Sequence, residues 1–300
     1  MTQLLPRTQA AAVGNPFADA TTVRALGGGR YRGELDDTWN LRPLPQGGVL
    51  SATAVRAMEA ELNHPDQLPR TLHTTFVGQV SHGDLDIDVE VLRRGRSMSQ
   101  LRAQVRNPGS AHGHVTSCVF GSERKGFSFT DLTPPQEIPD PRDCPSFRDP
   151  PPEGIETPRQ HPFFAKRLEG RAVLGHPPWV EYVPDRAETA VWNRFDDPPV
   201  LDDGELDPLA LIVIADTMPG AVGEKLGHQK RTWFAPSIDL TVHLLDKWRS
   251  PWVLAHNRAR YAGHGYASAD IALWDCGENA SSTPRLIAYA TQLFLFSFVE

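Results

Sequence analysis

Residues 47–60 read GGVLSATAVRAMEA, and this stretch decides the fold of the 300-residue chain. Two glycines form a turn, and small and apolar residues dominate the stretch that follows. This composition predicts a helix that is buried on all sides rather than an amphipathic surface helix. A buried helix needs other elements packed around it, so we expect the neighbouring segments to supply strands.

Strand patterns follow this predicted helix. Residues 85–91 read LDIDVEV and alternate apolar and acidic side chains, which is the period of a half-buried strand. Residues 101–105 alternate again, and residues 114–120 form another apolar-rich strand candidate. Residues 94–97 lie between two of these strands and predict a hairpin turn. The first part of the chain therefore predicts one buried helix followed by antiparallel strands.

The same order of signals returns later in the chain. Asp207 and Pro208 are typical of a helix start, and residues 209–215 read LALIVIA, a fully apolar helix that we expect to end near Pro219. Further strands are predicted at residues 237–245, 252–261, 269–274 and 286–298. The repetition indicates two copies of one α+β unit.

A proline-rich segment separates the two copies. Residues 133–162 hold ten of the 27 prolines and show no apolar periodicity, which predicts an extended, solvated connector. It divides the chain into units at residues 1–132 and 163–300. Each unit would leave an unpaired edge strand, and pairing the two edges would join the sheets into one.

Charge and cysteine usage exclude several classes of protein. The net charge of −7 argues against a general affinity for nucleic acid or anionic membranes. Cys118, Cys144 and Cys276 have wide, unpatterned spacing, which excludes a disulfide framework and favours a reducing, cytoplasmic compartment. The longest apolar run, residues 209–215, is too short to cross a bilayer, so we expect no membrane insertion.

Cofactor and metal motifs are missing from the sequence. It holds no nucleotide-binding glycine loop, no nucleophile elbow and no H-E-x-x-H motif. His112 and His114 form the only close histidine pair, and no carboxylate or thiolate is placed to complete a metal site. We therefore expect no cofactor, no metal and no nucleic-acid partner.

Asp216 is the candidate for chemistry, because it directly follows the apolar run at residues 209–215. A carboxylate on a buried helix costs several kcal/mol unless it is paired or put to use. One interpretation is a helix-end residue that emerges into water, since Pro219 is close. The other is a general base whose pKa is raised by an apolar wall.

A lone base needs groups that hold the water it deprotonates. Ser237 and Thr241 stand four residues apart on one predicted strand, so they should share a face. Gln292 interrupts a run of aromatic and aliphatic residues, and a buried amide must find partners. It either joins strands or faces a cavity.

The order of these motifs resembles that of the TesB-like acyl-CoA thioesterase II family, the double hotdog thioesterases, across nearly the whole chain outside the connector. The resemblance rests on Trp39, PQGG at residues 45–48, TLHTTF at 71–76, VLRRGRS at 91–97, Ala215 with Asp216, PSIDLTVH at 236–243 and ATQ at 290–292. It implies an α+β double hotdog, in which two antiparallel sheets each wrap a central helix and join into one continuous sheet.

The resemblance also implies a reaction, the hydrolysis of fatty acyl-CoA thioesters by water that an Asp, a hydroxyl residue and a Gln polarise. Carried over by position, these are Asp216, Ser237 and Gln292. Relatives often show Thr where this chain has Ser237, and Thr241 is the substitute if the match is displaced along the strand.

Substrate contacts are implied in the same way. The acyl chain would lie in an apolar tunnel between helix and sheet, lined by Trp233 and Phe234, although both could equally be plain core. The CoA diphosphate needs cations at the tunnel mouth, for which the turn arginines Arg93, Arg94 and Arg96 are candidates unless they are merely solvated. By analogy with hotdog proteins, we expect a dimer of double hotdogs.

Two alternatives to hydrolysis remain open. The serine at position 237 and the long connector would also suit a non-catalytic acyl-CoA-binding or scaffold protein. An enoyl-thioester hydratase or dehydratase would pair an Asp with a His, and His228 lies twelve residues beyond Asp216.

Overall fold

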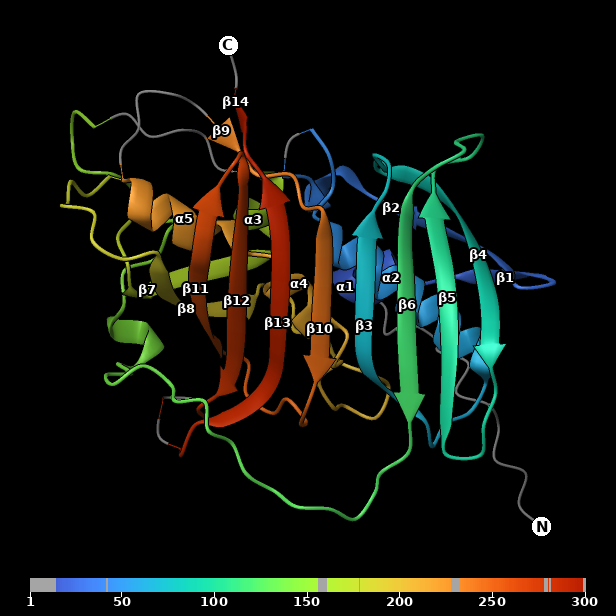
Figure 1. Ribbon diagram of the computed structural model, residues 1–300. Coiled ribbons are helices and arrows are strands. Elements are labelled where there is room, and N and C mark those ends of the chain that lie inside the picture. The colour runs from blue at the N-terminus through green and yellow to red at the C-terminus, as the bar shows by residue number, and fades with distance from the viewer. Residues whose placement is uncertain are drawn as a thin grey trace.

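One twelve-stranded antiparallel sheet forms the body of the molecule. The computed structural model describes residues 15–41, 43–155, 161–177, 179–227, 233–277, 280 and 282–298. Figure 1 shows the strands from β4 to β11 side by side in front of helices α1, α2 and α4, with β7 and β8 behind them. The strand order is β1-β2-β4-β5-β6-β3-β10-β13-β12-β11-β8-β7.

The first half of the chain contains the predicted buried helix, and the structure confirms it. Its elements are α1 (Pro16–Thr21), β1 (Arg24–Gly27), β2 (Arg30–Leu35), the 3-10 turn η1 (Asp37–Trp39), α2 (Gly47–Leu62), β3 (Leu68–Phe76), β4 (Gly83–Arg93), β5 (Met98–Arg106) and β6 (His114–Gly121). Most residues of α2 are buried, and the helix packs against β3, β4, β5 and β6. A helix so enclosed needs small and apolar side chains all round.

The second half repeats the plan with a broken helix. Its elements are η2 (Pro141–Asp143), α3 (Pro162–Lys166), β7 (Leu168–Leu174), β8 (Glu188–Phe195), α4 (Ala210–Ala215), α5 (Pro219–Leu226), β9 (Trp233–Phe234), β10 (Asp239–Leu244), β11 (Val253–Gly263), β12 (Tyr266–Asp275), β13 (Arg285–Leu295) and β14 (Ser297–Phe298). The expected helix end near Pro219 is instead the start of α5, because proline is well tolerated in the first turn of a helix.

The two halves join as predicted, edge to edge. Strand β3 pairs antiparallel with β10, and His73 lies opposite Thr241. Behind this seam α2 and α4 touch so closely that a Cβ at Gly48 would lie 2.5 Å from the carbonyl oxygen of Ile212. The first half therefore meets the second through both the sheet and the helix layer.

The proline-rich connector is only partly solvated, which corrects the prediction. Trp192 Nε1 donates to the carbonyl of Pro139 at 3.0 Å, and Ser146 forms a bridge with Arg171 of β7. Cys144 is buried in an apolar cluster with Trp192. Proline lacks the N–H that a strand interior needs, but its carbonyls still accept hydrogen bonds and its ring covers apolar surface. Composition alone could not show that the connector packs against an apolar face of the sheet, which includes Trp192 of β8.

Candidate active site

Asp216 lies at the C-terminal end of α4 and is only 7% exposed, so it does not emerge into water. Its carboxylate accepts hydrogen bonds from both halves of the chain. The backbone N–H of Gly48 donates to Oδ2 at 2.9 Å, and the hydroxyl of Ser237 donates to Oδ1 at 3.3 Å. Gln292 Nε2 also donates to Oδ1. The buried carboxylate is therefore held from three sides.

Gln46 aligns the two helix ends that make the site. Its Oε1 accepts from the N–H of Val49 at 2.9 Å, which caps the start of α2. Its Nε2 donates to the carbonyl of Val213 at 2.9 Å, near the end of α4. The positive end of the α2 dipole thus faces the Asp216 carboxylate and favours its charge. No role for Gln46 is predicted from the sequence, although its position before a buried helix is a capping signal.

Gln292 and Ser237 complete a closed triangle with Asp216. Gln292 is 2% exposed on β13, and its Nε2 donates to Ser237 Oγ at 2.9 Å as well as to the carboxylate. The other amide atom, Oε1, is buried and has no hydrogen-bond partner within the described part of the chain. The amide thus keeps one acceptor open beside the carboxylate.

Thr241 does not belong to this cluster, and the expectation that it shares a face with Ser237 is wrong. Thr241 pairs with Thr291, whereas Ser237 forms a bridge with Phe294. Ser237 and Thr241 are four residues apart, but their partners Phe294 and Thr291 are only three apart. The strand therefore contains one extra residue, which places the side chains of Ser237 and Thr241 on opposite faces of the sheet. Thr241 Oγ1 instead lies 2.9 Å from His73 Nδ1 in an exposed contact.

The turn arginines lie at the opposite end of α2 from Asp216, and their contact with the CoA diphosphate stays a prediction. Arg94 donates to the carbonyls of Leu62 and Glu61 at 2.5 and 3.2 Å, at the C-terminal end of the helix. With a rise of 1.5 Å per residue, the two ends of α2 are about 20 Å apart. Arg93 and Arg96 flank Arg94 in the same hairpin. Sequence could not show that a helix end with free carbonyls lies beside this turn.

Trp233 and Phe234 form the short strand β9, which pairs with β14. Trp233 packs edge-on against Phe296 with ring centroids 5.5 Å apart, and Phe234 is half exposed. The strand ends three residues before Ser237, so both aromatics lie near the site in sequence. His228, the residue on which the hydratase alternative depends, lies outside the described residues.

Burial raises the pKa of Asp216 to about 6, and the hydrogen bonds donated by Gln292, Gly48 and Ser237 oppose that rise. A carboxyl group with this pKa is largely ionised at neutral pH. It is also a stronger base than an exposed aspartate, which suits it to accept a proton from water.

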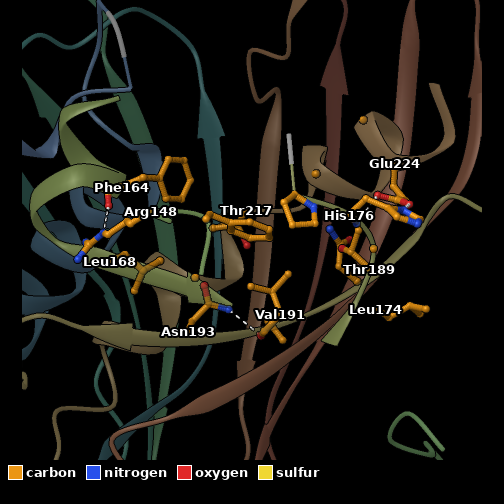
Figure 2. A pocket seen from close by; sticks show the side chains of 18 of the residues that line it. Arg148, Phe164, Leu168, Leu174, His176, Thr189, Val191, Asn193, Thr217 and Glu224 are labelled. Atoms are coloured by element: carbon orange, nitrogen blue, oxygen red, sulfur yellow. Dashed lines mark hydrogen bonds and ion pairs between the residues drawn. The ribbon is translucent and has the colours of Figure 1, made fainter. Parts of the chain in front are cut away.

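A cavity of about 760 Å³ begins beside Thr217, the residue after Asp216. Figure 2 shows Thr217 in its wall together with side chains of β7 and β8. Trp233 and Phe234 are not among the residues that line this cavity, and their contact with an acyl chain stays a prediction. Gly220, Gly223 and Glu224 of α5 line the space, so it lies under this helix.

No group of three or more His, Cys, Asp or Glu side chains within the described ranges could hold a metal ion. His114 is buried against Phe76, with ring centroids 4.7 Å apart, and burial lowers its pKa to about 4. Its neutral imidazole is therefore part of the apolar packing. Within the same ranges, no helix is long and apolar enough to span a bilayer.

A sheet that wraps a buried helix, built twice and joined at β3 and β10, defines a double hotdog protein. The chain belongs to the acyl-CoA thioesterase family: the model of that family's C-terminal domain matches residues 141–296, and the model of its N-terminal domain matches residues 35–121. The protein is thus a thioester hydrolase.

Solved structures share this fold over almost the whole chain. A hot dog fold protein from Alicyclobacillus acidocaldarius is 25% identical with a TM-score of 0.74, covering 94% of this chain and 97% of that one. The acyl-CoA thioesterase II TesB2 of Mycobacterium marinum is 20% identical with a TM-score of 0.69, covering 95% and 99%. The tesB protein of Mycobacterium avium subs paratuberculosis is 16% identical with a TM-score of 0.70, covering 96% and 100%. A search of curated proteins found no match.

Proposed function

We propose that the protein hydrolyses acyl-CoA thioesters with a water molecule that Asp216 activates and that Ser237 and Gln292 help to hold. The observation that carries this proposal is the closed triangle of hydrogen bonds among these three side chains, of which Asp216 and Gln292 are buried. The family to which the chain belongs supports the substrate class.

The open acceptors suit a bound water. A carboxylate has about four lone-pair sites, so Asp216 can still accept a proton beside the donors already in place. Gln292 Oε1 accepts the second hydrogen of the same water, and the lone pair of the water oxygen is then directed away from both acceptors. A thioester carbonyl held on that side meets an oriented nucleophile.

The reaction balances without a further reagent. Asp216 takes a proton as the water oxygen bonds to the carbonyl carbon and the C=O electron pair moves onto oxygen. When the carbonyl re-forms, the C–S bond breaks, and the leaving thiolate receives the proton from Asp216. The products are the free acid and the CoA thiol.

Substitution of Asp216 tests the proposal. Asp216→Asn removes the proton acceptor but keeps the shape of the side chain, so we expect release of free thiol from a medium-chain acyl-CoA to fall by about 10²–10⁴-fold. Circular dichroism would confirm that the variant is folded. Wild-type rates in a folded Asp216→Asn protein would refute the assignment.

A matched pair of hydroxyl substitutions extends this test. Ser237→Ala removes a donor to Asp216 and should lower thiol release by at least about tenfold. Thr241→Val removes a hydroxyl four residues away on the outer face, where it contacts His73, and should leave the rate near wild type. Saturable acyl-CoA binding by the wild-type protein without thiol release would instead support the scaffold alternative.

A further inference from the structure

The cavity under α5 has walls that differ in character. Apolar side chains of α3, β7 and β8 form much of one side, among them Phe164, Leu168 and Val191 (Figure 2). Arg148 also borders the space, but its guanidinium is bound to Asp196 at 2.8 and 3.0 Å. The apolar side therefore suits a hydrocarbon group rather than a phosphate.

Glycines form the α5 side of the cavity. Gly220 and Gly223 stand three residues apart on one face of the helix, and both line the space. A Cβ added at either position would meet no atom within 4 Å. Close packing therefore does not require glycine here, although each glycine in a helix interior costs about 1 kcal/mol relative to alanine. Both glycines leave room in the cavity, and Gly223, in the helix interior, does so at a cost in stability.

Asn257, one of the residues that line the cavity, carries an unpaired acceptor. It lies on β11, is 3% exposed and lines the cavity. Its Nδ2 donates to the carbonyl of Met218 at 2.8 Å. A carbonyl only accepts, so this contact determines which amide atom is nitrogen. The other atom, Oδ1, is buried without a hydrogen-bond partner among the described residues.

An unsatisfied buried acceptor costs about 1–3 kcal/mol, so it is a place where a ligand that carries a donor gains affinity. Met218 follows Asp216 by two residues, which places the Asn257 amide within about 13 Å of the Asp216 main chain. Part of an acyl chain whose thioester lies at Asp216 can therefore reach Asn257.

We infer that the acyl group of the substrate enters this cavity and carries a hydroxyl that donates to Asn257 Oδ1. The inference rests on the proposed thioester hydrolysis and narrows its substrate class to hydroxyacyl thioesters. Asn257 is a specificity residue in this scheme, because it contacts the substrate away from the reacting carbonyl. Thr217, the residue after Asp216, lines the cavity, and the α5 glycines provide the room.

A positional series of substrates tests the inference. Thiol release is measured for a medium-chain acyl-CoA and for its analogues that carry one hydroxyl at each successive carbon. We expect at least one analogue to exceed the plain substrate about tenfold in kcat/KM. In Asn257→Leu that advantage should disappear, because the acceptor is gone. Equal or lower kcat/KM for every hydroxylated analogue in the wild-type protein would overturn the inference.

Asn257→Leu also removes the donor to Met218, so a second variant guards against misfolding. Gly223→Leu places a side chain into the cavity and raises helix propensity, and Gly126→Leu is the matched control on an exposed segment, where a Cβ also meets nothing within 4 Å. We expect Gly223→Leu to lower the ratio of medium-chain to acetyl-CoA turnover at least tenfold, and Gly126→Leu to preserve it. An unchanged ratio in an active Gly223→Leu enzyme would overturn the cavity assignment and leave the proposed function standing.

Calorimetry tests the cavity assignment by binding alone, without relying on catalysis by Asp216. The probe is the preferred hydroxyacyl-CoA, titrated into Asp216→Asn with and without Gly223→Leu. Weaker binding in the double variant supports the cavity assignment whether or not Asp216 is the base. Equal binding by both proteins would count against it.

Discussion

At the scale of single residues, Asp216 shows how one side chain can be costly for folding and useful for chemistry. Its burial would be prohibitive without partners, and the donors Gly48, Ser237 and Gln292 reduce that cost. They do not remove it, since the pKa of Asp216 stays above its ordinary value of 3.8. The remaining cost makes stability depend on pH.

The sign of that dependence follows from the direction of the shift. Because the pKa of Asp216 rises to about 6 in the folded chain, the folded state holds its proton over a range where the unfolded state has lost it. Stability should therefore fall as pH rises from about 4 to about 7, by about 2 kcal/mol from this residue. Asp216→Asn lacks this loss, so its free energy of unfolding relative to wild type should increase by that amount between pH 4 and pH 7.

Urea denaturation of both proteins at the two pH values measures this difference. All other titrating groups are common to the two proteins and cancel in the comparison. A difference that stays constant from pH 4 to pH 7 would contradict a raised pKa at Asp216.

At the scale of elements, the contact between α2 and α4 positions the site. Gly48 allows the two helices to touch, since an added Cβ would lie 2.5 Å from Ile212 O and 2.9 Å from Val213 Cα. Both atoms belong to the backbone of α4, so no side-chain rotation can relieve the clash. The same residue also supplies the N–H that binds Asp216.

Two glycine substitutions should therefore have opposite effects. Gly48→Ala should lower the free energy of unfolding by about 1–3 kcal/mol, because it forces α2 and α4 apart. Gly223→Ala, on α5 with open space around its Cβ, should raise it by up to about 1 kcal/mol through helix propensity. Chemical denaturation measures both, and similar effects of the two substitutions would show that the helix contact is not tight.

At the scale of the whole molecule, the two halves depend on each other at both ends of α4. Gly48 meets Asp216 at the end of α4. Before the start of α4, Asp207 forms a buried ion pair with Arg56 and accepts a hydrogen bond from the N–H of Leu209. Arg56 and Asp207 are 7% and 3% exposed. Buried ion pairs are costly to break from one side, because the remaining charge stays unpaired.

A double-mutant cycle measures this link between the halves. Arg56→Met should cost about 3 kcal/mol, and adding Asp207→Asn should restore part of that stability, with a coupling energy above about 1 kcal/mol. The exposed pair Arg102–Glu90 is the matched control, for which we expect a coupling below about 1 kcal/mol. Equal couplings in the two cycles would mean that the buried pair does not hold the halves together.

The amino-acid sequence by itself determined the elements of the fold and the acid at its centre. The apolar run that leads to Asp216 and the alternation at residues 85–91 are local patterns, and local sterics and burial relate them directly to a helix and a strand. The repetition of these patterns also predicted the continuous sheet, because two exposed edges can satisfy each other.

Only the tertiary structure decided which groups meet. An extra residue before β10 places Ser237 and Thr241 on opposite faces of the sheet. Arg94 binds carbonyls at the end of α2 that is far from the site. Asn257 lines a cavity under α5. Gly48 and Asp216 are 168 residues apart, and hydrogen bonds between such distant positions depend on strand register and helix contact. Strand register and helix contact produce no periodic pattern in the sequence, because both depend on how the whole chain packs rather than on adjacent residues.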